Sequence, residues 1–269
     1  RMEKYLPDAK TFKFKKEIFH FAPALGKIAD EVFVNAFDNI NRPSTKKNKR
    51  IPTRNIKIKY CTETGRVTVE NDGTTIPVAM HQEHNMYVPT MVFGHLRTGE
   101  NYDDKQKRYG GGRNGFGAKL CNIFSSEFTV RCIDSVNGQE FNQTWSDGMQ
   151  TTSEPKITKT SLKNDRTEVS FIPDWKHFKM DKMNRAFVKY ITMRALEIAA
   201  CSPKDVKVYL NNQLLPVNNL GDYVSLYTEE PVTYVKISKY WEVAIYPDNG
   251  VDKIEVPSFV NGICTSRGG

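Results

Sequence analysis

Apolar and polar positions alternate along three short stretches in the first part of the chain: residues 11–21 (TFKFKKEIFHF), 55–61 (NIKIKYC) and 65–71 (GRVTVEN). A period of two places successive side chains on opposite faces, so each stretch is predicted to be a β-strand. Only Thr62, Glu63 and Thr64 separate the last two stretches, and Gly65 lies beside this turn, which predicts a hairpin.

A helical period follows Pro23, and the helix is predicted to begin at about Leu25. One stripe of the segment LGKIADEVFVNAFDNINR is apolar and contains Ile28, Val32, Ala36 and Ile40. A second stripe contains Glu31, Asn35 and Asp38, spaced i, i+4 and i+7. Because the second stripe holds acids and amides without lysine, it is predicted to face an enclosed site. The alternative is a partly exposed amphipathic helix with an incidental acidic edge.

The third predicted strand ends in Asn71-Asp72-Gly73, a sequence typical of a turn. An ordinary strand-end turn explains it. A second, compatible interpretation is that Asn71 or Asp72 hydrogen-bonds a ligand and that Gly73 leaves room for that ligand above the backbone. Farther along, residues 86–109 begin apolar and become polar, which predicts a mobile lid ahead of the next motif.

Residues 110–117 contain five glycines in eight positions, immediately ahead of an apolar segment. A Walker A loop is excluded because Ala118 stands where that motif requires lysine, and a dinucleotide fingerprint is excluded because no strand precedes the loop. What remains is a glycine loop opening onto a predicted helix, GAKLCNIF, whose first N–H groups attract anions such as phosphate. Arg113, Asn114 and Lys119 could bind a nucleotide there; a purely structural glycine turn is the alternative.

Composition narrows the class of protein. The 269 residues are 39% hydrophobic, enough for a folded core, and the formal net charge is +8. This charge permits contact with nucleic acid without requiring it, and the basic run at 44–50 is predicted to be a solvated loop rather than a DNA-contacting patch. No apolar run is long enough to span a membrane. The segment 186–200 is predicted to be a core helix in which Lys189 and Arg194 form a wet face.

The cysteines are odd in number and widely spaced, at Cys61, Cys121, Cys132, Cys201 and Cys264. This pattern predicts free thiols in a reducing compartment and therefore an intracellular protein. No CxxC pair is present, and His81 and His84 lack a clustered third ligand, so a zinc site is not expected.

The order of these features, together with the segments KIADEVFVNAFDN, NMYVPTMVFGHLRTGENYDD, GGRNGFGAKLCNIFS, DVKVYLNNQLLPV and SFVNGICTSRGG, resembles the ATPase region of eukaryotic-type (type IIA) DNA topoisomerase II. That family belongs to the superfamily of gyrase, histidine kinases, MutL and the heat-shock chaperones, and the resemblance covers most of residues 10–269. It implies an α/β fold: a two-layer α/β sandwich of the Bergerat type, with a mixed sheet and helices on one face. It also implies an ATP-binding domain at residues 1–220, followed at 221–269 by the truncated beginning of an α+β transducer domain.

The resemblance assigns a role to each candidate residue. Glu31 would be the general base for the attacking water, Asn35 the magnesium ligand and Asn71 the contact on the adenine side. The residues that would touch the nucleotide sugar are Gly99, Glu100 and Asn101. The phosphate cradle would consist of Gly112, Arg113, Asn114, Gly115, Phe116, Gly117, Ala118 and Lys119.

The chain departs from the family pattern at two places. Thr75 stands where the family turn has a second glycine, so it is expected to narrow the base pocket or to shift the turn. Gly99 and Glu100 replace a pair of serines, which puts a carboxylate near the ribose.

The function implied by the resemblance is that of an ATP-hydrolysing domain with ATP and Mg²⁺ as cofactors. In the whole enzyme, a nuclear DNA-binding isomerase, ATP binding would close a homodimeric clamp so that one DNA duplex passes through another. Most of the N-terminal arm and the transducer lysine that reaches the γ-phosphate are expected outside this sequence. The chain by itself is therefore expected to bind ATP, to hydrolyse it weakly and to stay monomeric.

Other functions remain open from the sequence. The same residues would serve the ATPase domain of a chaperone-type or mismatch-repair clamp. A non-hydrolysing nucleotide-binding module is a further alternative, although an intact Glu31 argues for hydrolysis. A pure DNA-binding module is the least favoured, because no segment has the basic and amide pattern of a helix that reads a DNA groove.

Overall fold

The computed structural model describes residues 2–20, 22–42, 44, 49–95, 117–238, 240–247 and 257–265. The chain divides into two compact units, one made by residues 22–183 and the other by residues 1–21 together with 184–269. The first unit contains all the described candidate residues of the nucleotide site. Within the described ranges, no helix has the length and hydropathy needed to cross a membrane.

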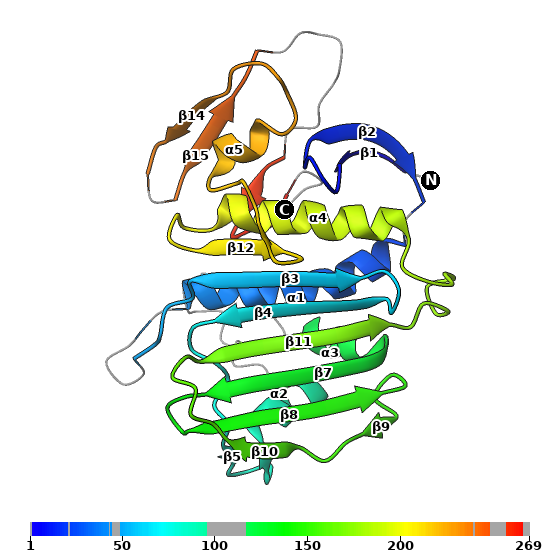
Figure 1. Cartoon of the computed structure of the whole chain (residues 1–269), viewed down its shortest axis with the longest axis vertical. Coiled ribbons are helices and arrows are strands. Elements are labelled where there is room, and N and C mark those ends of the chain that lie inside the picture. The colour runs from blue at the N-terminus through cyan, green and yellow to red at the C-terminus, as the bar shows by residue number, and fades with distance from the viewer. Residues whose placement is uncertain are drawn as a thin grey trace. The chain divides into compact units, whose positions relative to one another are not determined.

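The unit formed by residues 22–183 is built on one antiparallel sheet (Figure 1). Its strands follow the spatial order β10-β8-β7-β11-β4-β3, and β9 pairs with β8. The bounds are β3 (Asn55–Cys61), β4 (Arg66–Asp72), β7 (Ser125–Asp134), β8 (Gln139–Ser146), β9 (Thr151–Thr152), β10 (Lys156–Lys159) and β11 (Arg166–Pro173). A separate short hairpin is formed by β5 (Met80–His81) and β6 (Met86–Tyr87). The hairpin predicted from the alternating stretches at 55–71 is confirmed as β3 and β4.

The helices of this unit are α1 (Pro23–Asn41), α2 (Val88–Gly94) and α3 (Gly117–Ile123), and they lie on one face of the sheet (Figure 1). Helix α1 starts at a proline, whose fixed φ suits the first helical turn and whose missing N–H would be unpaired there in any case. It ends at Asn41, and the next residue, Arg42, is extended with ψ 124° because a proline follows it in the sequence and disfavours helix at the preceding residue. The expected two-layer α/β architecture with helices on one face is confirmed.

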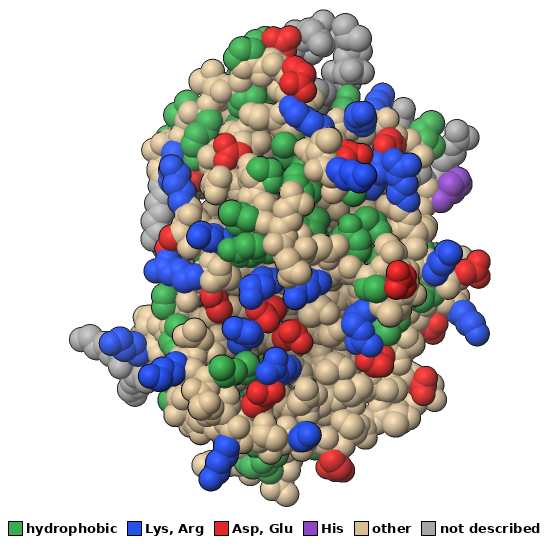
Figure 2. All heavy atoms as spheres, in the orientation of Figure 1, with side chains coloured by type: hydrophobic (Ala, Val, Ile, Leu, Met, Phe, Trp, Pro, Cys, Tyr) green, Lys and Arg blue, Asp and Glu red, His purple; other side chains and the backbone are tan. Residues whose placement is uncertain are grey.

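The two faces of the sheet differ in polarity. The buried core residues on the helix-covered face include Ile56, Ile58, Val67, Val69, Phe128, Val130, Phe141, Trp145, Val169 and Phe171. The opposite face carries ion pairs between strands: Lys57–Glu70 at 3.0 Å, Arg66–Glu127 at 2.8 Å and Arg131–Glu140 at 2.7 Å. Figure 2 shows this mixture of basic and acidic side chains over the sheet. A polar residue on the helix-covered face is therefore an exception that needs a cause.

The second unit contains a two-stranded sheet from the N-terminus and a long helix, with several short elements after it. Its strands pair as β1 (Met2–Pro7) with β2 (Phe14–Phe19), β12 (Lys207–Leu210) with β13 (Gln213–Leu214), β14 (Thr233–Lys236) with β15 (Glu242–Ile245), and β16 (Phe259–Val260) with β17 (Ile263–Cys264). Its helices are α4 (Arg185–Cys201) and α5 (Leu220–Val224). Tyr223 is fully buried and contacts the rings of Phe14, Tyr227 and Phe259, which makes it a centre of this core.

The wet face predicted for the helix at 186–200 is wrong for the two residues on which it rested. Lys189 and Arg194 of α4 are 3% and 4% exposed. Each has an acidic partner: Lys189 pairs with the partly exposed Glu17, and Arg194 pairs with the buried Glu197. A helix can bury a charged side chain when an oppositely charged residue pairs with it, although an unpaired charge would be expected to face the solvent.

The cysteines behave as expected from their spacing. Cys61, Cys121, Cys132, Cys201 and Cys264 are all free thiols. Cys121 and Cys132 are completely buried, and burial raises the pKa of both, so their side chains are neutral packing groups.

Candidate functional site

Helix α1 presents two of the candidate residues one turn apart. The Glu31 side chain is 24% exposed, and Asn35 is open to solvent. The Nζ atom of Lys27 lies 2.6 Å from Oε1 of Glu31, one turn toward the N-terminus. The polar stripe of α1 thus contains a lysine, which contradicts the sequence interpretation that it holds only acids and amides. Lys27 pairs with Oε1 of Glu31, and Oε2 is the other carboxylate oxygen.

Glu31 is packed against the first residue of α3. A Cβ atom built on Gly117 would lie 2.0 Å from Oε2 of Glu31 and 2.8 Å from its Cδ. No side chain fits at this position, so the Glu31 carboxylate requires a glycine at position 117. The helix predicted at 117–124 is confirmed as α3, and its start lies beside the predicted general base.

The next two candidate residues lie in the first turn of α3. Ala118 is 8% exposed and Lys119 is 2% exposed. Desolvation lowers the pKa of the Lys119 ammonium, because burial disfavours its charged form. Helix α3 is also tied to α2, since Nδ2 of the buried Asn122 donates a hydrogen bond of 3.1 Å to the carbonyl of Phe93. The other loop candidates lie outside the described residues: Gly99, Glu100, Asn101, Gly112, Arg113, Asn114, Gly115 and Phe116.

Asn71 lies near the end of β4 on the helix-covered face. It is 6% exposed, and it stands directly opposite Ile56 of β3 and Thr167 of β11. Its Nδ2 atom donates a hydrogen bond of 3.0 Å to the carbonyl of Asp72. A buried amide at the edge of an apolar face can recognise the polar edge of a base.

Asp72 and Gly73 build the turn. The Oδ1 atom of Asp72 accepts hydrogen bonds from the backbone N–H groups of Arg54 at 2.6 Å and Asn55 at 2.8 Å. Gly73 has φ +84°, and a Cβ atom there would lie 2.7 Å from the backbone nitrogen of Thr53. The glycine therefore makes room for Thr53, and the Asp72 carboxylate is occupied by the hydrogen bonds of the turn.

Thr167, which lies beside Asn71 and contacts Thr75, was not singled out from the sequence. Thr75 is 7% exposed; its Oγ1 atom lies 3.0 Å from the carbonyl of Arg166 and 2.7 Å from Oγ1 of Thr167. Cys132 of β7 stands directly opposite Thr167 of β11, and burial raises the pKa of its thiol to about 12. The signal for Thr167 was available in the sequence, because RTEVSF places it in the same period-two series as Val169 and Phe171.

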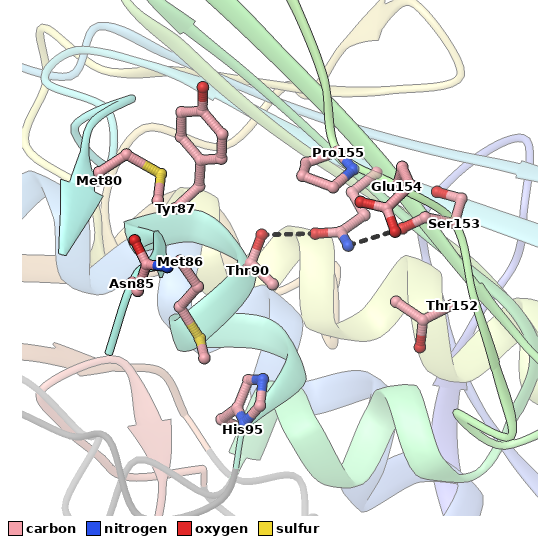
Figure 3. A pocket seen from close by; sticks show the side chains of 11 residues that line it. Met80, Asn85, Met86, Tyr87, Thr90, His95, Thr152, Ser153, Glu154 and Pro155 are labelled. Carbon is pink, nitrogen blue, oxygen red and sulfur yellow. Dashed lines mark hydrogen bonds between the residues drawn. The ribbon is translucent and has the colours of Figure 1, made fainter. Parts of the chain in front are cut away.

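A separate cavity lies between α2 and the outer strands of the same sheet (Figure 3). It has a volume of about 420 Å³, and its lining includes Met80, Tyr87, Thr90, Gln143 and Ser153. Thr90 donates a hydrogen bond of 2.7 Å to Oε1 of Gln143, whose Nε2 atom donates one of 2.9 Å to the carbonyl of Ser153. None of the described candidate residues lines this cavity, and its hydrogen bonds fix α2 on the sheet.

The helix-covered sheet with these residues can be compared with known proteins. The family described as histidine kinase-, DNA gyrase B-, and HSP90-like ATPase matches residues 22–173. The chain belongs to this ATPase family. The matched residues fall within the unit formed by residues 22–183, which carries Glu31, Asn71 and Gly117.

Within the ATPase family, the similar curated proteins are type II DNA topoisomerases. DNA topoisomerase 2 of Bombyx mori is 44% identical over 258 residues, and DNA topoisomerase 2 of Drosophila melanogaster is 43% identical over 265 residues. These matches cover 92% and 95% of this chain but 16% and 17% of those proteins. The chain therefore spans about a sixth of the length of these relatives.

Solved structures agree with these matches. The ATPase region of Saccharomyces cerevisiae topoisomerase II superposes with a TM-score of 0.88 at 36% identity, covering 98% of this chain and 68% of that one. The ATPase domain of Thermus thermophilus gyrase B has a TM-score of 0.58 at 17% identity, which shows a shared fold. The chain is thus the counterpart of the ATPase region of a type II topoisomerase.

Proposed function

We propose that this chain binds ATP with Mg²⁺ between α1, α3 and the helix-covered face of the sheet, and that Glu31 activates the water that attacks the γ-phosphate. The observation that carries the proposal is the packing of Glu31 against Gly117, which puts a carboxylate where the glycine loop meets its helix. A carboxylate within reach of the attacking water can contribute roughly 10²- to 10⁴-fold in rate as a general base.

Asn35 fits a magnesium ligand. Its exposed side-chain amide lies one helical turn from Glu31, and an amide oxygen is a hard donor suited to this cation. Among the described residues, no group of three or more His, Cys, Asp or Glu side chains could hold a metal ion. A site with one amide oxygen suits magnesium bound mainly by nucleotide phosphates and water. When bound, the ion would neutralise phosphate charge that develops during hydrolysis.

The remaining candidate residues would hold the nucleotide along its length. Asn71 would contact the base, and Gly99, Glu100 and Asn101 the sugar. The phosphates would lie in the cradle formed by Gly112, Arg113, Asn114, Gly115, Phe116, Gly117, Ala118 and Lys119. The position of Lys119 in the first turn of α3 supports this arrangement, because an ammonium group there can pair with a phosphate.

The activity of the whole protein is part of the same proposal. Its named relatives are type II DNA topoisomerases, so ATP binding here would close a homodimeric clamp that passes one DNA duplex through another in the nucleus. We propose that residues 221–269 begin the transducer domain and that residues 1–220 form the ATP-binding domain. The chain by itself would be monomeric and weakly active.

Calorimetric titration with the β,γ-imido analogue of ATP, with and without Mg²⁺, tests this proposal. Wild type is expected to bind, Glu31→Ala to bind about as well, and Asn35→Ala to lose the magnesium-dependent part of the affinity. Glu63→Ala, in the exposed turn between β3 and β4, is the control and should bind like wild type. Absence of binding by the folded wild type would contradict the proposal, and so would a Glu31→Ala variant that hydrolyses ATP at the wild-type rate.

A further inference from the structure

A chain of side-chain hydrogen bonds connects the last residue of the basic run at 44–50 to the turn that follows β4. The Nη2 atom of Arg50 donates a hydrogen bond of 2.9 Å to Oδ1 of Asn39, near the C-terminal end of α1. The Nδ2 atom of Asn39 donates one of 3.0 Å to Oγ1 of Thr53. Thr53 in turn donates one of 3.1 Å to the carbonyl of Asp72. All four residues belong to the unit formed by residues 22–183.

The groups at its two ends fix the direction of this chain. A guanidinium group can only donate a hydrogen bond, and a carbonyl oxygen can only accept one. Asn39 must therefore turn its oxygen to Arg50 and its nitrogen to Thr53, and the single hydroxyl proton of Thr53 must go to the Asp72 carbonyl. Because every donor points the same way and the first donor is charged, each bond polarises and strengthens the next. Removal of the guanidinium should therefore weaken the bonds at Thr53 as well as the bond at Asn39.

The chain ends on the carbonyl that also binds Asn71. The Asp72 carbonyl accepts hydrogen bonds from Thr53 and, at 3.0 Å, from Nδ2 of Asn71. Thr53 thus holds the acceptor that orients the Asn71 amide, whose Oδ1 atom and second Nδ2 proton remain for a ligand. Thr53 is 3% exposed and packs against Gly73, so its contact with the turn is a close one.

The backbone beside Arg50 is held to the same turn by other bonds. The N–H of Ile51 donates a hydrogen bond of 2.6 Å to Oγ1 of Thr74, and the N–H of Thr74 donates one of 2.9 Å to the carbonyl of Ile51. Removal of the Arg50 side chain should leave these bonds in place. A change at the nucleotide site would then report on the hydrogen-bond chain rather than on the course of the backbone.

The hydrogen-bond chain also involves the stripe of α1 that carries the proposed chemistry. Asn39 follows Glu31 and Asn35 on this helix at a spacing of i, i+4 and i+8. The chain therefore joins the helix of the proposed general base and magnesium ligand to the turn that carries Asn71.

We propose that Arg50 is a positioning residue for the nucleotide site: acting through Asn39 and Thr53, it holds the Asn71 amide in the orientation that the nucleotide meets. This inference rests on the proposed nucleotide function. It gives a specific role to one residue of a basic run that was predicted from the sequence to be a solvated loop.

Calorimetric titration of the full chain with the β,γ-imido analogue of ATP and Mg²⁺ tests the inference. The variants are Arg50→Met, Thr53→Val, Thr53→Ser and the double variant Arg50→Met with Thr53→Val. Lys49→Met is the matched control, because it removes the same charge from the neighbouring, exposed position. Thermal unfolding shows whether each variant is folded.

Arg50→Met should weaken binding about two- to thirtyfold, the usual range for a substitution within a coupled network. Lys49→Met should bind like wild type. Thr53→Val removes a donor and an acceptor and should weaken binding at least as much as Arg50→Met, whereas Thr53→Ser keeps the hydroxyl and should keep the affinity. The double variant should bind like Thr53→Val alone, because Arg50 has no further effect once the chain is broken.

The side-chain amide of Asn71 provides a second readout that needs no nucleotide. Its two resonances in a proton–nitrogen correlation spectrum are identified as the pair that Asn71→Ser removes. Arg50→Met and Thr53→Val should shift this pair, and Lys49→Met should leave it in place. A general loss of stability would not produce this pattern in folded protein.

The outcomes separate the two proposals. If folded wild type binds no imido analogue, the nucleotide function fails, and the role of Arg50 fails with it. If wild type binds but Arg50→Met binds as tightly as Lys49→Met, only the role of Arg50 is overturned. It is also overturned if Arg50→Met lowers the affinity while the Asn71 resonances stay in place. Arg50→Leu is measured in parallel, so that one folded variant without the guanidinium is sufficient to decide.

Discussion

The Oε2 atom of Glu31 occupies the space that a side chain on Gly117 would need, with only 2.0 Å between that oxygen and a Cβ atom built on the glycine. The two residues belong to different helices, and their contact joins the proposed general base to the end of the glycine loop. Lys27 holds the other carboxylate oxygen at 2.6 Å. The ion pair with Lys27 and the lack of a side chain on Gly117 thus determine the position of Glu31.

Gly117→Ala is expected to displace Glu31 and to lower the rate of ATP hydrolysis by about a hundredfold or more, since a general base acts only within hydrogen-bond reach. The new methyl group should also destabilise the fold by about 1–3 kcal/mol, as overpacking usually does. Steady-state hydrolysis and denaturant unfolding measure the two effects.

A double-mutant cycle provides the control for Gly117. In the Glu31→Ala background the carboxylate is gone, so Gly117→Ala should cost less stability than in wild type. Equal costs in the two backgrounds would mean that the methyl group meets something other than Glu31.

Lys119 is expected to make nucleotide binding sensitive to alkaline pH. Burial lowers its pKa from the usual 10.5, and nucleotide phosphates favour its charged form. Affinity for the imido analogue of ATP should therefore fall as the pH rises through the lowered pKa. Lys119→Arg keeps its charge over this range and should remove most of the fall, whereas Lys119→Met should bind more weakly at pH 7.

The stability of the unliganded protein should rise with pH, whereas the affinity for the nucleotide should fall. The folded state holds the Lys119 proton less tightly than the unfolded state, so unfolding free energy should rise with pH between the lowered pKa and 10.5. Titrations and thermal melts at several pH values above 7 measure both effects. A Lys119→Met variant whose affinity falls with pH as steeply as that of wild type would assign the effect to another group.

The elements around Glu31 could be predicted from the sequence because local patterns determine them. The period of α1, the alternation in β3 and β4, and the helix after the glycine loop all depend on neighbouring residues. The Thr75–Thr167 contact could not be predicted in this way, because it joins residues 92 positions apart through the register of β11. The pairing of Lys27 with Glu31 was within reach of the sequence, since its i, i+4 spacing is visible there.

The burial of Arg194 marks a different limit. A charged residue within an apolar helix is normally assigned to the solvent side, and burial follows only if a partner is available. Glu197 stands three positions later and supplies that partner, but the sequence does not show which side of α4 faces the core. Substitutions at Arg194 and Glu197 therefore test whether this buried ion pair contributes to the stability of the fold.

Arg194→Met alone should destabilise the second unit by about 3–5 kcal/mol, because it leaves the buried Glu197 carboxylate without its partner. Arg194→Met combined with Glu197→Leu should recover most of that loss, because two apolar side chains leave no buried charge. Arg194 also contacts the carbonyl of Gly262 at 3.5 Å, so the recovery should be incomplete. Denaturant unfolding of the single and double variants measures these differences.

The exposed pair Lys236–Glu242, at 2.6 Å in the same unit, is the matched control for Arg194. Lys236→Met should cost no more than about 1 kcal/mol, since solvent screens this pair. A small effect of Arg194→Met, similar to that of Lys236→Met, would contradict this prediction and would mean that Glu197 finds water or another partner when the arginine is removed.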